Sequence, residues 1–129
     1  DVYSGKIKRY IIENNLENKI TLEGYVKDLN NWYKSNDCIV SNSVHEGTQT
    51  SIVEGVATGC WAISKDWDGA EEIVDEKGLF TNVNELEKCI NLFYEWNDEE
   101  RNKNIKKARE KLISKLTNRP KMHDIISNL

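Results

Sequence analysis

The sequence predicts an α/β domain in which a Rossmann-like parallel sheet is flanked by helices. Short apolar runs rich in β-branched residues alternate along the chain with longer segments of helical period. These runs show little polar alternation, as expected of parallel strands that are buried on both faces. Gly, Asp and Asn stand at most of the joins. Since 129 residues suffice for one core, we expect a single domain spanning residues 1–129.

The first third of the chain is expected to form two helices and two strands. Residues 5–16 repeat apolar side chains at a helical period. Residues 19–24 predict a short strand that ends in glycine, and Asp28 is a candidate cap for a short helix over residues 28–36. The apolar run over residues 38–42 suits a buried parallel strand.

The middle of the chain continues the alternation. A helix over residues 48–58 should stop at Gly59, because glycine favours the conformation that ends a helix. Strands are predicted at residues 61–64 and 78–81. A loop with one helical turn, residues 66–74, should join them.

Two long helices are predicted near the C-terminal end. Residues 82–97 and 98–116 both have a helical period, and Pro120 precedes a short tail helix. The first of these helices should bury one apolar face, formed by Leu86, Ile90, Phe93 and Tyr94. Strands that alternate with helices in this way predict parallel pairing.

The composition excludes several classes of protein. Hydrophobic residues make up 38% and charged residues 31% of the chain, a folded rather than a disordered profile. No apolar run approaches the ~18 residues needed to span a bilayer. The cysteines and histidines are too scattered for a disulfide framework or a structural zinc site, so a reducing cytoplasm fits best.

Positive charge is concentrated in residues 101–121. This region holds nine basic residues and a single acid, Glu110, although the whole chain has a net charge of −4. One interpretation is a patch for anionic lipid or a protein partner, which would place the chain peripherally at the inner face of a membrane. The simpler interpretation is a solvated helix whose charges match the helix macrodipole. No aromatic residues interleave with the cations, so nucleic-acid binding is not expected.

A pair of glutamates brackets the start of the third predicted helix. Glu46 and Glu54 stand eight positions apart. Glu87 and Glu95 have the same spacing inside another helix, so the spacing alone decides nothing. The context is more informative, because Glu46 follows an apolar strand and ligands of parallel sheets bind beyond the carboxyl ends of strands.

The residues around this pair suit a phosphorylated, polyhydroxylated ligand. A helix N-terminus presents unpaired N–H groups and a partial positive charge, which attract anions. Gly47 has no Cβ and lets a ligand approach the backbone. Glu54 could accept two hydroxyl protons from a vicinal diol such as ribose. Hydroxyl and amide groups of the first turn come from Thr48, Gln49, Thr50 and Ser51.

Two other interpretations of the glutamate pair exist. The acid and base of a glycosidase lie ~5–9.5 Å apart, whereas the mostly helical chain between Glu46 and Glu54 rises by roughly 12 Å. This separation excludes the glycosidase. In the simpler alternative Glu46 favours the helix dipole and Glu54 is a surface residue, and these residues alone leave that alternative open.

A longer pattern surrounds the pair. Its elements, in order, are Gly24, Asp28, Tyr33, Asp37, Ser41 or Ser43, Glu46 with Gly47, Glu54, Gly59 and the Gly-Ala-Glu-Glu-Ile-Val run of residues 69–74. In this order and spacing, residues 20–80 resemble the C-terminal, donor-binding domain of family-4 retaining glycosyltransferases, which have the GT-B fold. The resemblance implies hexosyl-type transfer from a nucleoside-diphosphate sugar in polysaccharide biosynthesis. The acceptor, a glycan, a lipid-linked glycan or another molecule, would be bound by an N-terminal domain.

The resemblance also implies roles for matched positions. Glu46 would be the catalytic residue near the hydroxyls of the donor sugar, and Glu54 would bind the ribose. The loop after Gly24, with Tyr25 and Val26, would lie near the base. No metal or other cofactor is expected, because amides and basic side chains neutralise the leaving diphosphate. The donor sugar and diphosphate would contact His45, Gly47, Thr48, Gln49 and Thr50.

The chain also departs from the family pattern. Thr48 and Gln49 stand where family members often have an aromatic residue and a glycine, which bears on the choice of sugar. The family's upstream strands and Arg/Lys pair have no counterpart before the first helix. We therefore expect a fragment that lacks the acceptor domain and the first strands of this one, and that transfers little sugar by itself.

Two other functions fit the sequence. One is another GT-B-like sugar-nucleotide enzyme, such as an epimerase or a phosphorylase. The other is a non-catalytic module that docks through its basic C-terminal helix.

Overall fold

The computed structural model describes residues 2–44, 49–117 and 128, and it confirms the predicted α/β fold class. Three strands form one parallel sheet in the order β1-β2-β3. They are β1 (Cys38–Ser41), β2 (Trp61–Lys65) and β3 (Leu79–Phe80). In the register of the first pair, Cys38 lies beside Trp61 and Ser41 beside Ser64, so β1 and β2 end at the same edge of the sheet.

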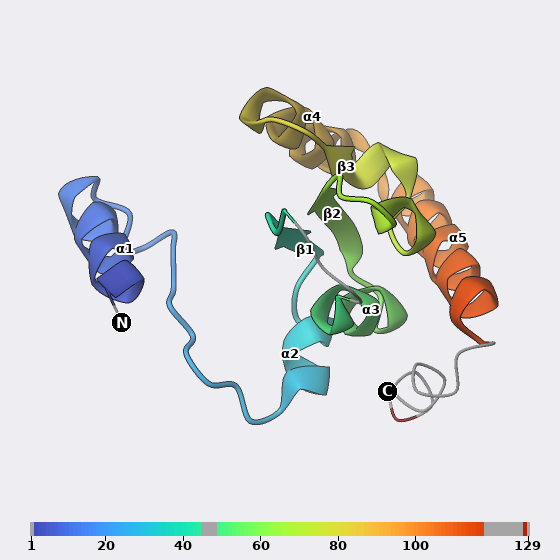
Figure 1. Ribbon diagram of the computed structural model, residues 1–129, viewed down its shortest axis with the longest axis horizontal. Helices are drawn as coiled ribbons and strands as arrows, with labels where there is room; N and C mark the ends of the chain where they lie inside the picture. Colours follow the sequence, from blue (N-terminus) through green and yellow to red (C-terminus); the bar gives the residue numbers. More distant parts are fainter. Residues whose placement is uncertain (1, 45–48, 118–127, 129) are drawn as a thin grey trace.

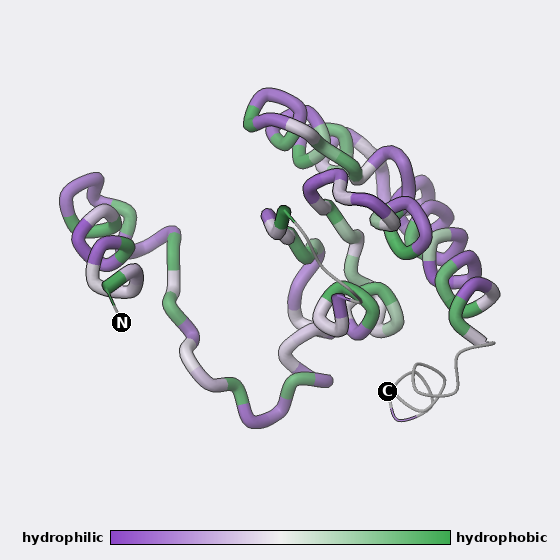
Figure 2. Tube along the Cα trace, viewed as in Figure 1, coloured by the Kyte–Doolittle hydropathy of each residue, from purple (hydrophilic) through white to green (hydrophobic). Residues whose placement is uncertain are grey.

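Helices precede, connect and follow the strands (Figure 1). The helices are α1 (Val2–Glu13), α2 (Leu29–Lys34), α3 (Thr50–Ala57), α4 (Val83–Glu95) and α5 (Asp98–Leu116), with short 3-10 turns η1 (Ala70–Glu72) and η2 (Glu76–Gly78). Helix α3 connects β1 to β2, as a crossover between parallel strands requires. Hydrophilic residues occupy much of α5 (Figure 2).

The central strand β2 divides the core into two clusters. Ala62 packs on one face of the sheet with Ile52 and Val53 of α3, together with the last turns of α5. Trp61 and Ile63 pack on the other face, in a cluster with α4. Alternating side chains of a strand point to opposite faces, so helices cover both sides of β2. Ile63 is fully buried and Trp61 is only 1% exposed, as expected for a strand buried on both faces.

Local signals in the sequence account for several helix ends. The Asp28 side chain accepts a hydrogen bond from the Asn31 backbone N–H at 3.2 Å, so the predicted cap of α2 is confirmed. Asn97 and Glu100 form a reciprocal capping box at the start of α5. Gly59, just beyond α3, has a φ of +105°, which confirms the predicted glycine stop.

The strand predicted at residues 19–24 is wrong. Residues 20–24 form neither a helix nor a strand, and Ile20 and Leu22 are both more than two fifths exposed. This segment belongs to the connection between α1 and α2, which runs apart from the sheet (Figure 1). A strand exists only where a second strand pairs with it, and the local pattern of the sequence cannot supply that partner.

Two smaller predictions differ from the structure or lie outside it. Tyr94 was expected on the buried face of α4, but its side chain is 57% exposed, because Phe93 takes the inward position. The tail helix after Pro120 lies outside the described residues. Among the residues that the structure describes, no helix has the length and apolar character needed to cross a membrane.

Candidate functional site

The carboxyl end of β1 and the start of α3 are joined by a side-chain hydrogen bond. Gln49 Nε2 donates to Ser41 Oγ at 2.7 Å, across the loop that connects the two elements. The bond places the first turn of α3 next to the edge where parallel sheets bind ligands. The predicted sugar and diphosphate contacts His45, Gly47 and Thr48, and the predicted catalytic residue Glu46, lie outside the described residues.

Gln49 is a buried polar residue with an unused acceptor. Its side chain is 5% exposed, and its Oε1 atom has no hydrogen-bond partner among the described residues. Its backbone carbonyl accepts the first helical bond from Val53 N–H at 3.0 Å, and its side chain caps no backbone amide of α3. Thr50, the first residue of α3, is exposed. At this helix start, as at any other, the first backbone N–H groups have no partner within the helix, and the exposed Thr50 lies beside them.

Glu54 lies in the second turn of α3 and faces α2. Its side chain is half-buried. Tyr33, on α2, lies near enough to Glu54 to feel the charge of its carboxylate. Burial, and then the negative charge of this carboxylate, raise the pKa of Tyr33 to about 12. Tyr33 therefore remains a neutral hydrogen-bond donor throughout the physiological pH range.

Sequence reasoning missed this partner of Glu54. Tyr33 is 4% exposed, and its ring meets Trp32 edge-on with centroids 5.3 Å apart. Its backbone carbonyl accepts a hydrogen bond from Cys60 Sγ at 3.2 Å. In the sequence, Tyr33 stood out only as one element of the longer pattern around the glutamate pair. No local signal links it to a carboxylate on another helix.

The structure does not bring Tyr25 together with Glu54. Tyr25, predicted to lie near the base, is 92% exposed, and the neighbouring Val26 is half-buried. Both residues belong to the connection that enters α2 (Figure 1). A contact of this segment with a nucleotide held at α3 would require the connection to approach that helix.

The described residues offer neither a reactive thiol nor a metal centre. Burial, and then the charge of Asp37, raise the pKa of Cys38 to about 12 and also raise that of Cys60. Both thiols are therefore protonated near neutral pH. Within the described ranges, no group of three or more His, Cys, Asp or Glu side chains could hold a metal ion.

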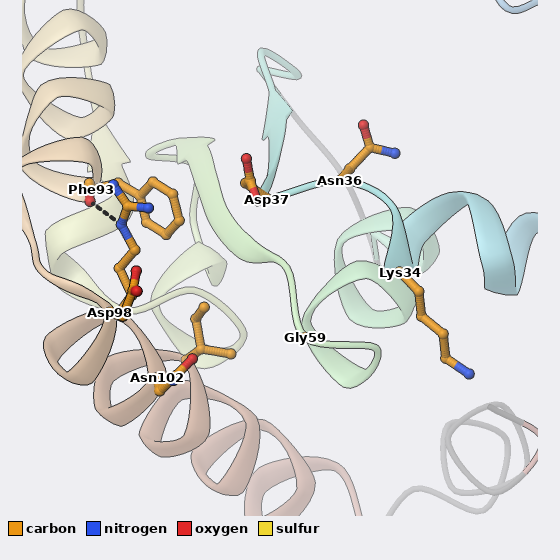
Figure 3. A pocket seen from close by; sticks show the side chains of 9 residues that line it. Lys34, Asn36, Asp37, Gly59, Phe93, Asp98 and Asn102 are labelled. Atoms are coloured by element: carbon orange, nitrogen blue, oxygen red, sulfur yellow. Dashed lines mark hydrogen bonds between the residues drawn. The ribbon is translucent and has the colours of Figure 1, made fainter.

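An open cavity of about 380 Å³ lies at the opposite edge of the sheet (Figure 3). It is lined by Asp37 and Gly59, which precede β1 and β2, and by Asp98 and Arg101 of α5. Arg101 Nε donates to the Phe93 carbonyl at 3.1 Å, the dashed line of Figure 3. Since ligands of open parallel sheets bind beyond the carboxyl ends of the strands, this cavity is distinct from the predicted donor site.

Comparison with known proteins identifies the family. The family described as glycosyl transferases group 1 matches residues 3–95, more than half of the chain. Protein CapJ of Staphylococcus aureus is 32% identical over 82 residues, which cover 60% of this chain and 21% of CapJ. The chain thus spans about a fifth of the length of that relative. No solved structure matches the chain significantly. The chain belongs to the group 1 glycosyl transferases.

Proposed function

We propose that the chain forms the donor-binding part of a family-4 retaining glycosyltransferase with the GT-B fold. In this proposal it binds a nucleoside-diphosphate sugar, and the sugar passes to a glycan, lipid-linked or other acceptor held by an N-terminal domain. The observation that carries the proposal is the Gln49–Ser41 hydrogen bond. It brings the start of α3 to the carboxyl edge of the sheet in a chain of this family.

The first turn of α3 suits the diphosphate. Its free backbone N–H groups and the positive end of the helix dipole attract an anion without a metal. As the leaving diphosphate gains charge during transfer, donors that are already oriented stabilise it with little reorganisation. Thr50 adds an exposed hydroxyl on the same turn.

The glutamates are assigned to the two ends of the donor. Glu46 would hold hydroxyls of the transferred sugar and position it for attack. Glu54, half-buried in the second turn of α3, would accept hydrogen bonds from the ribose. Tyr25 and Val26 stay the proposed contacts of the base.

A second candidate function is docking on an anionic membrane surface. Four of the five exposed lysines of α5 precede Leu112 and Leu116, the residues through which the helix packs into the core. The helical period places these lysines away from the packed side. They are Lys103, Lys106, Lys107 and Lys111. Co-sedimentation with vesicles that contain phosphatidylserine would support docking if charge reversal of all four lysines abolishes it.

Nucleotide titration tests the donor-binding proposal. Thermal unfolding of the chain is measured with UDP, GDP and ADP, because a ligand that binds the folded state raises the midpoint. We expect Glu54→Ala to abolish the rise produced by the preferred nucleotide. Glu87→Ala is the matched control, since Glu87 is an exposed glutamate on α4, and it should respond like the parent chain.

The titration separates two questions, whether the chain binds the donor nucleotide and whether Glu54 contributes to that binding. If no nucleotide stabilises the parent chain, donor binding by this chain is refuted. If a nucleotide stabilises the parent and Glu54→Ala equally, donor binding survives and the ribose role of Glu54 does not.

A further inference from the structure

A second cavity lies between α2, the end of α3 and α5, and we propose that it binds the phosphate group of a small molecule. Its volume is about 420 Å³, which is within the range of small-molecule sites. Two cations line it, Lys34 at the end of α2 and Arg109 of α5. The other described residues that line it carry no charge, and they are Ala57, Thr58 and Gly59.

This cavity is separate from the proposed donor site. Ala57 is the last residue of α3, and Gly59 stands just before β2, so the cavity lies at the amino edge of the sheet. The donor site is proposed at the carboxyl edge, beside the first turn of α3. Binding of a phosphate in this cavity therefore does not depend on the proposed donor function.

The end of α3 does not use up the cations. A helix C-terminus carries a partial negative charge, and its last four carbonyls lack helical partners. Three of these carbonyls in α3 accept backbone N–H groups of residues 58–60, at 2.9–3.1 Å. The fourth, that of Ala57, accepts the Nε–H of Arg109 at 2.8 Å. All four carbonyls are thus satisfied without Lys34 and without the Nη groups of Arg109.

Arg109 is held in a way that suits an oxyanion. Its Nε bond fixes one side of the guanidinium, and within the described part of the chain its two Nη groups make no hydrogen bond. The guanidinium is a planar fork whose N–H groups match two oxygens of a phosphate. Because the side chain is anchored before the ligand arrives, less rotamer entropy is lost on binding.

Lys34 supplies a second positive charge from a different helix. Its side chain is exposed and extends away from Asp37 (Figure 3). An ammonium group is a point charge on a flexible stem, so it can adjust to a phosphate bound at Arg109. Two cations that share a cavity repel each other, and a dianion between them replaces this repulsion with attraction.

The adjoining cavity of Figure 3 suits the rest of the ligand. Lys34 and Gly59 line both cavities, so the two lie side by side. Three side chains of the Figure 3 cavity can accept hydrogen bonds from hydroxyl groups, and they are Asp37, Asp98 and Asn102. The class of ligand that fits is therefore a phosphorylated sugar or polyol, with its phosphate at the cations and its hydroxyls at these acceptors.

Titration of the whole chain with glucose 6-phosphate and with inorganic phosphate tests the site, followed by proton–nitrogen correlation NMR at constant ionic strength. We expect saturable shifts of the backbone amides of Thr58 and Gly59. Lys34→Gln should weaken glucose 6-phosphate binding about tenfold, because one charge-assisted hydrogen bond is lost. Lys103→Gln is the matched control, since Lys103 is an exposed lysine of α5 outside the cavity, and it should bind like the parent chain.

A second variant separates geometry from charge. Arg109→Lys keeps the positive charge but loses the planar fork, so it should also weaken binding. Circular dichroism melting of each variant shows whether lost affinity follows lost folding. Lys34→Gln changes only an exposed side chain and should melt like the parent, so the test does not depend on the folding of Arg109→Lys.

Two comparisons identify the ligand and the place where it binds. Tighter binding of glucose 6-phosphate than of inorganic phosphate would support a phosphorylated sugar, whereas equal affinities would refute the contribution of the adjoining cavity. The proposal is overturned if the parent shows no saturable shift, or if Lys34→Gln binds as tightly as the parent. Shifts confined to Thr50 and Ser51 would also overturn it, because they would place the phosphate at the start of α3.

Discussion

Arg101 joins the end of α4 to the start of α5, and its removal should destabilise the chain. Its Nε donates to the Phe93 carbonyl and its Nη2 to the Tyr94 carbonyl, both at 3.1 Å. Its guanidinium also lies 4.8 Å from the centroid of the Phe93 ring. The two carbonyls belong to the last turn of α4, where helical carbonyls lack helical partners.

The expected loss follows from these contacts. Hydrogen bonds from a charged donor contribute about 1.5–3 kcal/mol each, and a partly solvated cation over an aromatic ring about 0.5–1 kcal/mol. Arg101 is half-buried and the Tyr94 side chain is exposed, so solvent competes for part of this gain. We therefore expect Arg101→Ala to lower the unfolding free energy by about 2–3 kcal/mol. Arg101→Lys should recover less than half of it, because an ammonium lacks the planar fork that reaches both carbonyls.

Urea denaturation followed by tryptophan fluorescence measures the change. The control is Lys103→Ala, an exposed residue on α5, which should stay within about 0.5 kcal/mol of the parent. An Arg101→Ala midpoint that matches the Lys103→Ala midpoint would refute the link between the helices. A complete rescue by lysine would show that charge alone accounts for the contact.

Two further predictions concern packing and protonation. In Gly78→Ala the new Cβ would meet the carbonyl oxygen of Ala62 in β2. Urea denaturation should therefore show that the free energy of unfolding falls by about 2–3 kcal/mol. The control is Gly5→Ala, which has open space around the new Cβ and should show no loss. The pKa of Tyr33 is about 12 in the folded chain against an ordinary 10.0, so the folded state holds this proton more tightly than the unfolded state. The stabilisation is complete below pH 10 and is lost as the pH rises towards 12. The stability difference between the parent chain and Tyr33→Phe should therefore shrink between pH 9.5 and about 11.5 in guanidinium titrations, and a constant difference would contradict the raised pKa.

The sequence predicted those elements whose signals act over a few residues. The β-branched run of β1, the aspartate before α2 and the glycine after α3 each determine local backbone geometry, and the strand, the cap and the helix stop are all present. The expected burial of β1 is wrong, because β1 lies at the edge of the described sheet and none of its four residues is buried. The turn η1 was expected as one helical turn, and it is present at Ala70–Glu72.

Features that depend on distant partners could not be predicted. Residues 19–24 have the residue types of a strand, but pairing is a property of the sheet and not of the segment. The influence of Glu54 on the pKa of Tyr33 acts between two helices whose relative placement appears in no local pattern. The roles of residues 45–48 stay predictions, because these residues lie outside the described part of the chain.

The unpaired edge of β1 is expected to affect the solubility of the chain. Within the described residues β1 pairs only with β2, so one row of its backbone amides and carbonyls has no strand beside it, and Val40 there is 48% exposed. Such a border is a template for edge-to-edge self-association between molecules. We therefore expect self-association, rather than thermal unfolding, to limit the concentration at which the chain can be studied. Light scattering should accompany every titration to detect it.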